Sequence, residues 1–363
     1  MAGMNLRLPG PTPLPQAVLN SMSRQIINHR GDESARLIKK INDTLQRLCG
    51  TSGDIYLMTG SGWAGVESAV VNTLAPGDTV LCASAGYFGE TFAKIAQIHG
   101  AAVEMLSFPD GAIVDPDAVA VKLRAMRDVK AVLMTHNESF TGVAHPLREI
   151  AAAVRDNSDA LLHVDAVSAT GAIDTQMDAW GVDTICTASQ KALMGSPGLA
   201  LIAVSERAFQ ASTQCKNPRF YFDWAPYHES FKVNSTPTTA ALTILYGLEA
   251  AADLILAEGI DNVYARHERV ATFTRERVRG LGLELFATQG FSPTLTAVCM
   301  PEGIDGDKVR TLARDQGVEF GGSWSRLQGK ILRIGHMGMT TEADIDDAVE
   351  VLGDVIAQLR AAK

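Results

Sequence analysis

Short apolar runs that each lead into a polar residue constrain this chain more than any other feature of its sequence. Residues 161–164 form one such run, which ends at Asp165, and residues 184–188 form another, which precedes Lys191. Runs of this length predict strands that are buried on both faces of a sheet. Lys191 follows Asp165 by 26 positions, which leaves room for a crossover between neighbouring parallel strands. A carboxylate and an amine are therefore expected at one edge of a sheet, where open α/β sheets bind ligands.

One kind of chemistry needs this pair of groups. A lysine amine can condense with the aldehyde of pyridoxal phosphate, and an aspartate facing the pyridine nitrogen keeps that nitrogen protonated. The ring then withdraws electrons from the α-carbon of an amino acid. The ordinary alternative is that Asp165 caps a helix and that Lys191 lies on the surface. The Gly-, Ser- and Pro-rich turn that follows Lys191 favours the cofactor interpretation.

Three short motifs surround these two residues: Val-Asp-Ala-Val-Ser at 164–168, Ser-Gln-Lys at 189–191 and Gly-Ser-Pro-Gly at 195–198. Together they resemble the class V aminotransferases, pyridoxal-phosphate enzymes of fold type I, and most closely the alanine–glyoxylate and serine–glyoxylate group. The resemblance covers nearly the whole chain. It implies an α/β fold with a mostly parallel seven-stranded sheet in a large cofactor-binding domain, residues 1–259, and a smaller C-terminal α/β domain, residues 260–363.

A glycine-rich turn joins a predicted strand to a predicted helix near residue 60. Gly60, Gly62 and Gly65 match the G-x-G-x-x-G pattern of dinucleotide sites, but that fingerprint needs an acidic residue at the end of the next strand. The next strand, residues 79–82, ends in Ala-Ser-Ala-Gly instead. The turn is therefore predicted to hold a single phosphate on backbone N–H groups at a helix N-terminus, and a nicotinamide oxidoreductase is disfavoured.

The resemblance implies roles for individual residues. Lys191 would be catalytic, Arg333 would bind the substrate carboxylate, and Thr236 would reach the cofactor phosphate of the partner in a homodimer. The residues implied in cofactor binding are Ser61, Gly62, Trp63, Phe88, Ser139, Asp165, Val167, Gln190, Lys191 and Thr236.

Some of these assignments have alternatives. Tyr87 is a rival of Phe88 for stacking on the pyridine ring, and both aromatics can instead belong to the core. Thr236 can simply cap the helix predicted to begin at Pro237. His136 and Glu138 are expected to form a hydrogen-bonded pair with a structural role.

Arg333 lies within an apolar, strand-like run. A guanidinium can bind a carboxylate through two hydrogen bonds, and burying it unpaired is costly. No second arginine is evident for a side-chain carboxylate, which favours serine or alanine as donor and glyoxylate or pyruvate as acceptor in a ping-pong reaction. Arg30 and Arg326 remain open as second arginines. One alternative is an aminotransferase with another donor, such as aspartate or aminoethylphosphonate. Another is a desulfurase or lyase of the same family, but a desulfurase would need a cysteine in the loop before Arg333, and residues 321–325 contain none.

The composition limits which partners, metal sites and cell compartments are expected. The chain has 32 basic and 41 acidic residues, a net charge of −9, which gives no reason to expect a nucleic-acid partner. No run of about 18 apolar residues or apolar signal core is present, so no membrane partner is expected. The five cysteines form no C-x-x-C pair, which suits the cytoplasm. No metal site is expected, because no second histidine stands at ligand spacing from His136.

The remaining segments predict ordinary elements. Residues 8–14 are too rich in proline for a helix and should run extended. An ordered loop near the dimer interface is expected over residues 215–238. Helices are predicted over residues 15–30, 33–48, 237–258, 261–279, 305–316 and 342–359. Strands are predicted over residues 199–204, 294–300, 318–320 and 331–334, and the first of these is expected to close the sheet.

Overall fold

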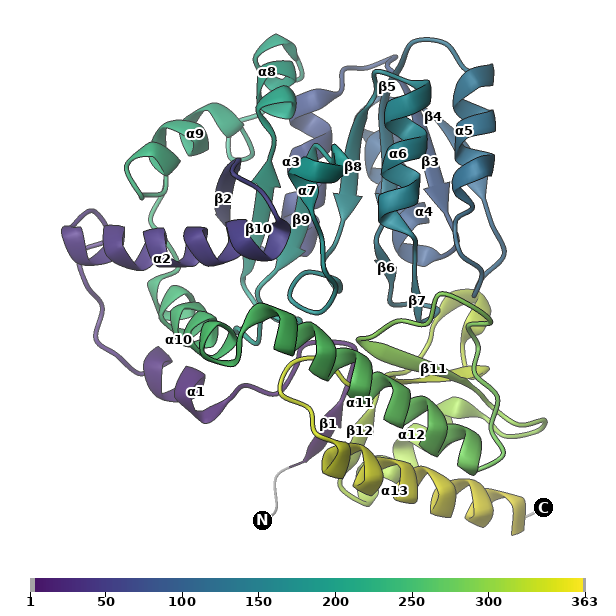
Figure 1. Ribbon diagram of the computed structural model, residues 1–363. Coiled ribbons are helices and arrows are strands. Elements are labelled where there is room, and N and C mark those ends of the chain that lie inside the picture. The colour runs from purple at the N-terminus through teal and green to yellow at the C-terminus, as the bar shows by residue number, and fades with distance from the viewer. Residues whose placement is uncertain (1–3, 362–363) are drawn as a thin grey trace.

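A seven-stranded sheet forms the centre of the computed structural model, which describes residues 4–361 (Figure 1). Six strands are parallel, and β10 runs antiparallel to both of its neighbours. The predicted mostly parallel sheet is thus confirmed. The expectation that residues 199–204 close the sheet is wrong, because β10 lies inside it and the edges are β2 and β4. In spatial order the strands are β2 (Asp54–Thr59), β10 (Leu199–Val204), β9 (Thr184–Ala188), β8 (Leu161–Asp165), β5 (Val129–Thr135), β3 (Thr79–Ser84) and β4 (Ala102–Ser107).

Helices cover both faces of this sheet (Figure 1). Successive residues of a strand point to opposite faces, and β5 shows it: Val132 packs in one hydrophobic cluster and Leu133 in the other. The first cluster includes Val119 and Ile150 of the helices on one face, and the second includes Phe92 on the other. The helices are α3 (Gly62–Thr73), α4 (Tyr87–Ile98), α5 (Pro116–Ala125), α6 (Leu147–Asn157), α7 (Met177–Trp180) and α8 (Glu206–Gln214).

Four longer or flanking helices connect the sheet to the rest of the chain: α1 (Gln16–Met22), α2 (Asp32–Cys49), α10 (Leu242–Glu258) and α11 (Ile260–Gly280). Two predicted boundaries are wrong. The helix expected over 15–30 ends at Met22, and the helix expected to begin at Pro237 begins at Leu242. Arg30 explains the second difference, because its guanidinium binds the carbonyls of Thr236 and Pro237 and thereby holds them outside the helix.

The C-terminal residues build a third hydrophobic cluster around two antiparallel strands, β11 (Leu295–Cys299) and β13 (Ile331–Gly335). Helices α12 (Gly306–Asp315) and α13 (Glu342–Ala361) pack on this cluster. Strand β12 (Val318–Phe320) pairs in parallel with β1 (Asn5–Arg7), which the sequence did not predict. Short elements complete the chain: β6 (Asn137–Glu138), β7 (Val143–Ala144) and the 3-10 helix η1 (Ser325–Leu327).

Gly259, with φ +89°, separates α10 from α11 at the predicted domain boundary. The division into two domains stays a prediction. Residues 1–3 and 362–363, at the outer ends of the two predicted domains, lie outside the described residues. No helix between residues 4 and 361 has an apolar stretch long enough to cross a membrane.

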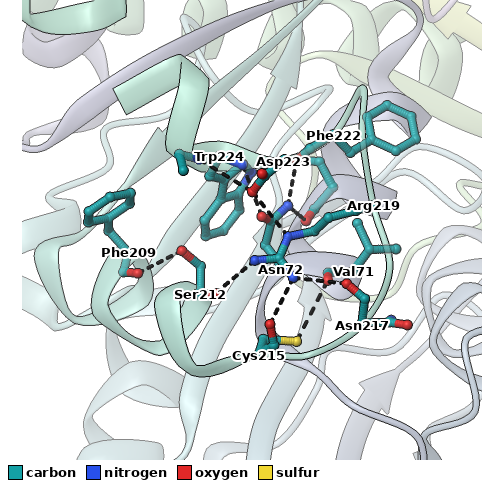
Figure 2. Close-up of polar contacts among 12 residues, drawn as sticks. Val71, Asn72, Phe209, Ser212, Cys215, Asn217, Arg219, Phe222, Asp223 and Trp224 are labelled. Carbon is teal, nitrogen blue, oxygen red and sulfur yellow. Dashed lines mark hydrogen bonds and ion pairs between the residues drawn. The ribbon is translucent and has the colours of Figure 1, made fainter. Parts of the chain in front are cut away.

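The segment expected to be a loop over residues 215–238 instead contains helix α9 (Trp224–Lys232). Figure 2 shows how the chain before this helix is fixed. Arg219 donates to the carbonyls of Ser212, Cys215 and Asn217 and contacts the carboxylate of Asp223. These contacts explain why a stretch of weak periodicity is ordered.

Candidate active site

The carboxyl ends of β8 and β9 bring Asp165 and Lys191 to one edge of the sheet. Asp165 is the last residue of β8, and Lys191 follows β9 by three positions. Burial and, to a smaller extent, the positive charge of Arg333 lower the pKa of Lys191 to about 8, against the opposing effect of Asp165. Burial also raises the pKa of Asp165 to about 6, against the backbone N–H of Val167, 2.9 Å away, and the Lys191 charge. The two charges are thus electrostatically linked, as the strand pattern predicted.

The proline-rich segment after β1 crosses directly over Lys191. The lysine Nζ donates to the carbonyl of Pro9 at 2.6 Å, and the hydroxyl of Thr12 donates to the Lys191 carbonyl at 3.1 Å. Gly10 has φ +96°, and a Cβ there would lie 2.5 Å from Cδ of Lys191. Only glycine satisfies both the backbone conformation and the space available. The segment is not helical, as predicted, but it bends at residues 9–11 instead of running fully extended, and it forms one wall of the site.

A helix N-terminus forms the opposite side of the site. Ser61 is the N-cap of α3, and its hydroxyl makes no capping hydrogen bond. The N–H of Ala64 donates to the Ser61 carbonyl at 2.9 Å, whereas the N–H groups of Gly62 and Trp63 precede the first intrahelical acceptor. A Cβ at Gly62 would come within 2.7 Å of Cγ2 of Val167. The glycine therefore lets the helix end approach the strand that carries Asp165. Among the residues described, the side-chain oxygen of Gln190 is buried without a partner, as expected of a group that contacts a ligand.

Aromatic rings link this helix end to the C-terminal half of the chain. The rings of Trp63 and Phe88 stack with centroids 5.8 Å apart and planes 20° apart. Tyr87 meets Phe88 edge to face at 5.6 Å, and Trp324 meets both of them edge to face at 5.2 and 6.2 Å. Sequence reasoning assigned no role to the Trp63 side chain and did not identify Trp324. The only sequence signal for Trp324 was an aromatic residue shortly before Arg333.

Glu138 has a different role from the predicted pairing with His136. Its carboxylate accepts hydrogen bonds from the backbone N–H groups of Phe88, Gly89 and Phe140, so it ties the start of α4 to the loop after β5. The Nδ1 atom of His136 is buried without a partner among the described residues. The expected hydrogen bond between these two side chains is therefore wrong, although the structural role of Glu138 is supported. Burial raises the pKa of Glu138 to about 7.

Arg333 lies on β13 and points toward the same loop. Its Nη1 donates to the carbonyl of Ser139 at 2.9 Å, and its Nε donates to the carbonyl of Gly322 at 2.8 Å. The guanidinium carbon lies 4.8 Å from the centroid of the Trp324 ring. The side chain is buried, and burial lowers its pKa to about 10. A cation that is bound only by carbonyls and a ring face retains its charge for an anionic ligand.

The other two arginines considered from the sequence are engaged elsewhere. Arg30 donates to Ser235 and to the carbonyls of Thr236 and Pro237. Arg326 binds the carboxylates of Glu90 and Asp110. Within a single chain, Thr236 is buried and its hydroxyl donates to the carbonyl of Thr238 at 2.8 Å. Its expected contact with a partner subunit stays a prediction.

These groups suit pyridoxal phosphate. The half-buried amine of Lys191 matches the aldehyde, the buried carboxylate of Asp165 matches a protonated ring nitrogen, and the first N–H groups of α3 match a phosphate. The side-chain oxygen of Gln190, buried without a partner among the described residues, is consistent with a ligand beside Lys191. In residues 4–361 no three His, Cys, Asp or Glu side chains gather as metal ligands would.

Comparison with known proteins identifies the family. The family model described as aminotransferase class-V matches residues 4–346. The chain is 35% identical over 98% of its length to the soluble hydrogenase 42 kDa subunit of Anabaena cylindrica, 93% of which is covered. It is also 35% identical to the L-aspartate–glyoxylate aminotransferase of Paracoccus denitrificans, with 97% and 91% of the two chains covered. The same identity holds for the serine–glyoxylate aminotransferase of Methylorubrum extorquens, with 95% and 89% covered.

A solved structure agrees with the sequence matches. The crystal structure of an alanine–glyoxylate aminotransferase from Nostoc sp. superposes with a TM-score of 0.93 at 30% identity, covering 98% of this chain and 96% of that one. The expected fold class is therefore confirmed over essentially the whole described chain.

Proposed function

The chain belongs to the class-V aminotransferases, which are pyridoxal-phosphate enzymes, and from this premise we propose that it transfers the amino group of serine or alanine to glyoxylate or pyruvate. The observation that carries the donor choice is the engagement of the other nearby arginines. Arg333 retains hydrogen-bonding capacity for one carboxylate, whereas Arg30 and Arg326 are bound to other groups of the chain. Neither of these two guanidinium groups is free to bind a second carboxylate of the donor.

We assign the cofactor contacts to the residues that surround Lys191. The N–H groups at Ser61, Gly62 and Trp63 and the amide of Gln190 would hold the phosphate. Asp165 would face the ring nitrogen. The ring would lie between Phe88 and Val167, with Ser139 near its oxygen substituent. When bound, pyridoxal phosphate supplies an aldehyde for the amines and a protonated ring that stabilises negative charge at the substrate's α-carbon.

The chain's own groups then have defined tasks. Arg333 binds and orients the substrate carboxylate. The carboxylate of Asp165 would stabilise a positive charge on the ring nitrogen of the bound cofactor. Because burial lowers the pKa of Lys191 to about 8, a fraction of its amine is neutral near neutral pH. That neutral Nζ can accept the proton that leaves the α-carbon and can deliver it elsewhere on the reacting molecule. The Pro9–Thr12 segment shields this amine from water.

We also propose that the protein acts as a cytoplasmic homodimer in which Thr236 reaches the partner's cofactor phosphate. The segment that carries Thr236 also presents two strongly exposed apolar side chains, Phe220 at 91% and Val233 at 66% exposure. Such exposure favours burial against another chain. Within the described residues all five cysteines are free thiols, as a reducing compartment permits.

Steady-state kinetics with glyoxylate as acceptor test the donor assignment. We expect kcat/KM for L-serine and L-alanine to exceed that for L-aspartate by about tenfold or more, because the second carboxylate of aspartate would be desolvated without a partner. Arg333→Lys should raise the KM of every donor, since an ammonium cannot form the two-pronged contact. A preference for aspartate would overturn the donor assignment, and an unchanged KM in the lysine variant would overturn the role of Arg333.

A further inference from the structure

A cluster of charges joins the loop before Arg333 to the helix that carries Phe88. Arg326 contacts Glu90, in the first turn of α4, through Nη1 at 2.9 Å and Nη2 at 2.8 Å. The same guanidinium contacts the Asp110 carboxylate through Nε at 2.5 Å and Nη2 at 2.7 Å. Its carbon also lies 5.5 Å from the centroid of the Phe140 ring. Paired contacts to two carboxylates fix an arginine far more firmly than a single surface ion pair does.

The loop held by Arg326 carries two groups that define the position of Arg333. Trp324, two residues before Arg326, presents its ring to the Arg333 guanidinium. Gly322 supplies the carbonyl that accepts from Nε of Arg333 at 2.8 Å. Ser325 has φ +51°, in the left-handed region, so the loop backbone needs outside contacts to keep its shape. A shift of the loop would therefore change both contacts of the guanidinium at once.

Trp324 also contacts aromatic residues of the large sheet's loops and helices. Its ring packs against Phe140 at 5.0 Å and edge to face against Tyr87 at 5.2 Å. Tyr87 precedes Phe88 on the same helical turn as Glu90. The ion pairs of Arg326 and the aromatic contacts of Trp324 thus both hold the loop of residues 322–326 against the first turn of α4. With two separate attachments, the loop can neither slide along the helix nor rotate about a single contact.

We infer that Arg326, held by Glu90 and Asp110, is a positioning residue that orients Arg333 through Trp324 and Gly322 for the carboxylate of the substrate. This inference rests on the proposed carboxylate-binding role of Arg333. The guanidinium of Arg326 is occupied by Glu90 and Asp110, and it fixes the loop that sets the plane of the Arg333 guanidinium. Because a two-pronged carboxylate contact depends on that plane, loosening Arg326 weakens carboxylate binding while the groups around Lys191 stay in place.

The test uses the cofactor-loaded protein and glycolate, which has the carboxylate of glyoxylate but a hydroxyl in place of its reactive aldehyde. Titration calorimetry gives the dissociation constant of glycolate, and steady-state kinetics give KM and kcat for L-serine. For Arg326→Ala we expect the dissociation constant of glycolate and the KM for L-serine to rise about three- to tenfold. The kcat and the affinity for pyridoxal phosphate should stay within about twofold of the parent. Arg326→Lys should recover part of the loss, because it keeps the charge but not the paired geometry.

Three further variants sharpen the comparison. Glu90→Ala removes one partner, and the double variant with Arg326→Ala should be no worse than Arg326→Ala alone, since both changes break the same contact. Arg269→Ala is the matched control. It breaks a surface pair with Glu342, 2.8 Å long, that lies outside the aromatic cluster, and it should leave glycolate binding unchanged.

The outcomes separate the two levels of the proposal. If Arg333→Lys weakens glycolate binding but Arg326→Ala behaves like Arg269→Ala, the positioning role is wrong and the carboxylate site stands. If neither Arg333→Lys nor Arg326→Ala affects glycolate binding, the assignment of Arg333 itself is wrong. A loss of thermal stability in Arg326→Ala without a change in glycolate affinity would also overturn the inference.

Discussion

Asp165 shows most clearly how a single residue departs from what folding alone would favour. Its carboxylate is buried at the end of β8, and its described hydrogen-bond donor is the backbone N–H of Val167. Burial raises the pKa to about 6 because the charged form has lost its water. A fold selected only for stability would place an uncharged side chain there, so the carboxylate is best explained by a positively charged ligand group.

Asp165→Asn should therefore separate activity from stability. The change preserves volume and removes the buried charge, so we expect the melting temperature of the cofactor-free protein to stay the same or rise. Transamination should fall on the order of 100-fold or more, because the charge that keeps the ring nitrogen protonated is lost. Differential scanning fluorimetry and steady-state kinetics measure the two effects.

Asp183, directly before strand β9 of the same sheet, provides a matched control. It is also buried, but it accepts hydrogen bonds from Leu162 N at 2.8 Å and from Ser205 and pairs with Arg207. Asp183→Asn should lower the melting temperature by several degrees and leave kcat per folded, cofactor-loaded chain nearly unchanged. If Asp165→Asn instead destabilised the protein like Asp183→Asn and kept its activity, Asp165 would be a structural residue.

At the scale of elements, strands were predicted where the sheet is buried on both faces. Strands β8, β9 and β10 are buried at every residue and are mostly apolar for that reason, and their positions followed from the sequence. Edge strand β4 is only partly buried, so it lacks a continuous apolar run and left no clear signal. The pairing of β1 with β12 joins residues more than 300 positions apart, and no local pattern encodes such a contact.

The start of α10 shows a second limit of local reasoning. Thr236 and Pro237 have the sequence of a helix start, yet the helix begins at Leu242. Arg30, about 200 residues earlier in the chain, binds their carbonyls and overrides the local preference. Trp324 was missed for the same reason, since its neighbours Tyr87 and Phe140 come from distant parts of the sequence. The motif residues around Lys191 were identified because their spacing is local.

At the scale of the whole molecule, buried histidines link stability to pH. Burial lowers the pKa of His136, His163 and His267 to about 4 and that of His145 and His336 to about 3. An unfolded histidine takes up a proton near pH 6.5, so acid favours the unfolded chain at all five positions. Glu138 and Asp165 act in the opposite direction, because burial raises their pKa values to about 7 and about 6.

The five histidines outnumber the two carboxyl groups, so we expect the stability of the cofactor-free protein to fall as the pH drops from about 6.5 towards 4. Each net proton is worth on the order of 1.4 kcal/mol per pH unit. Urea denaturation at a series of pH values measures the slope, and His163→Asn should reduce it by about one proton. A free energy of unfolding that is constant or rises on acidification would show that these histidines are not buried as neutral groups.

The visible absorption spectrum of the purified, cofactor-loaded protein tests the central claim most directly. The account predicts a yellow band from the cofactor joined to Lys191, which is lost on addition of L-serine or L-alanine and returns on addition of glyoxylate. Lys191→Ala should lack that band while the phosphate-binding residues remain intact. If the protein shows no such band with pyridoxal phosphate, the role of Lys191 is contradicted. If the band forms but neither donor removes it, the proposed substrates are contradicted.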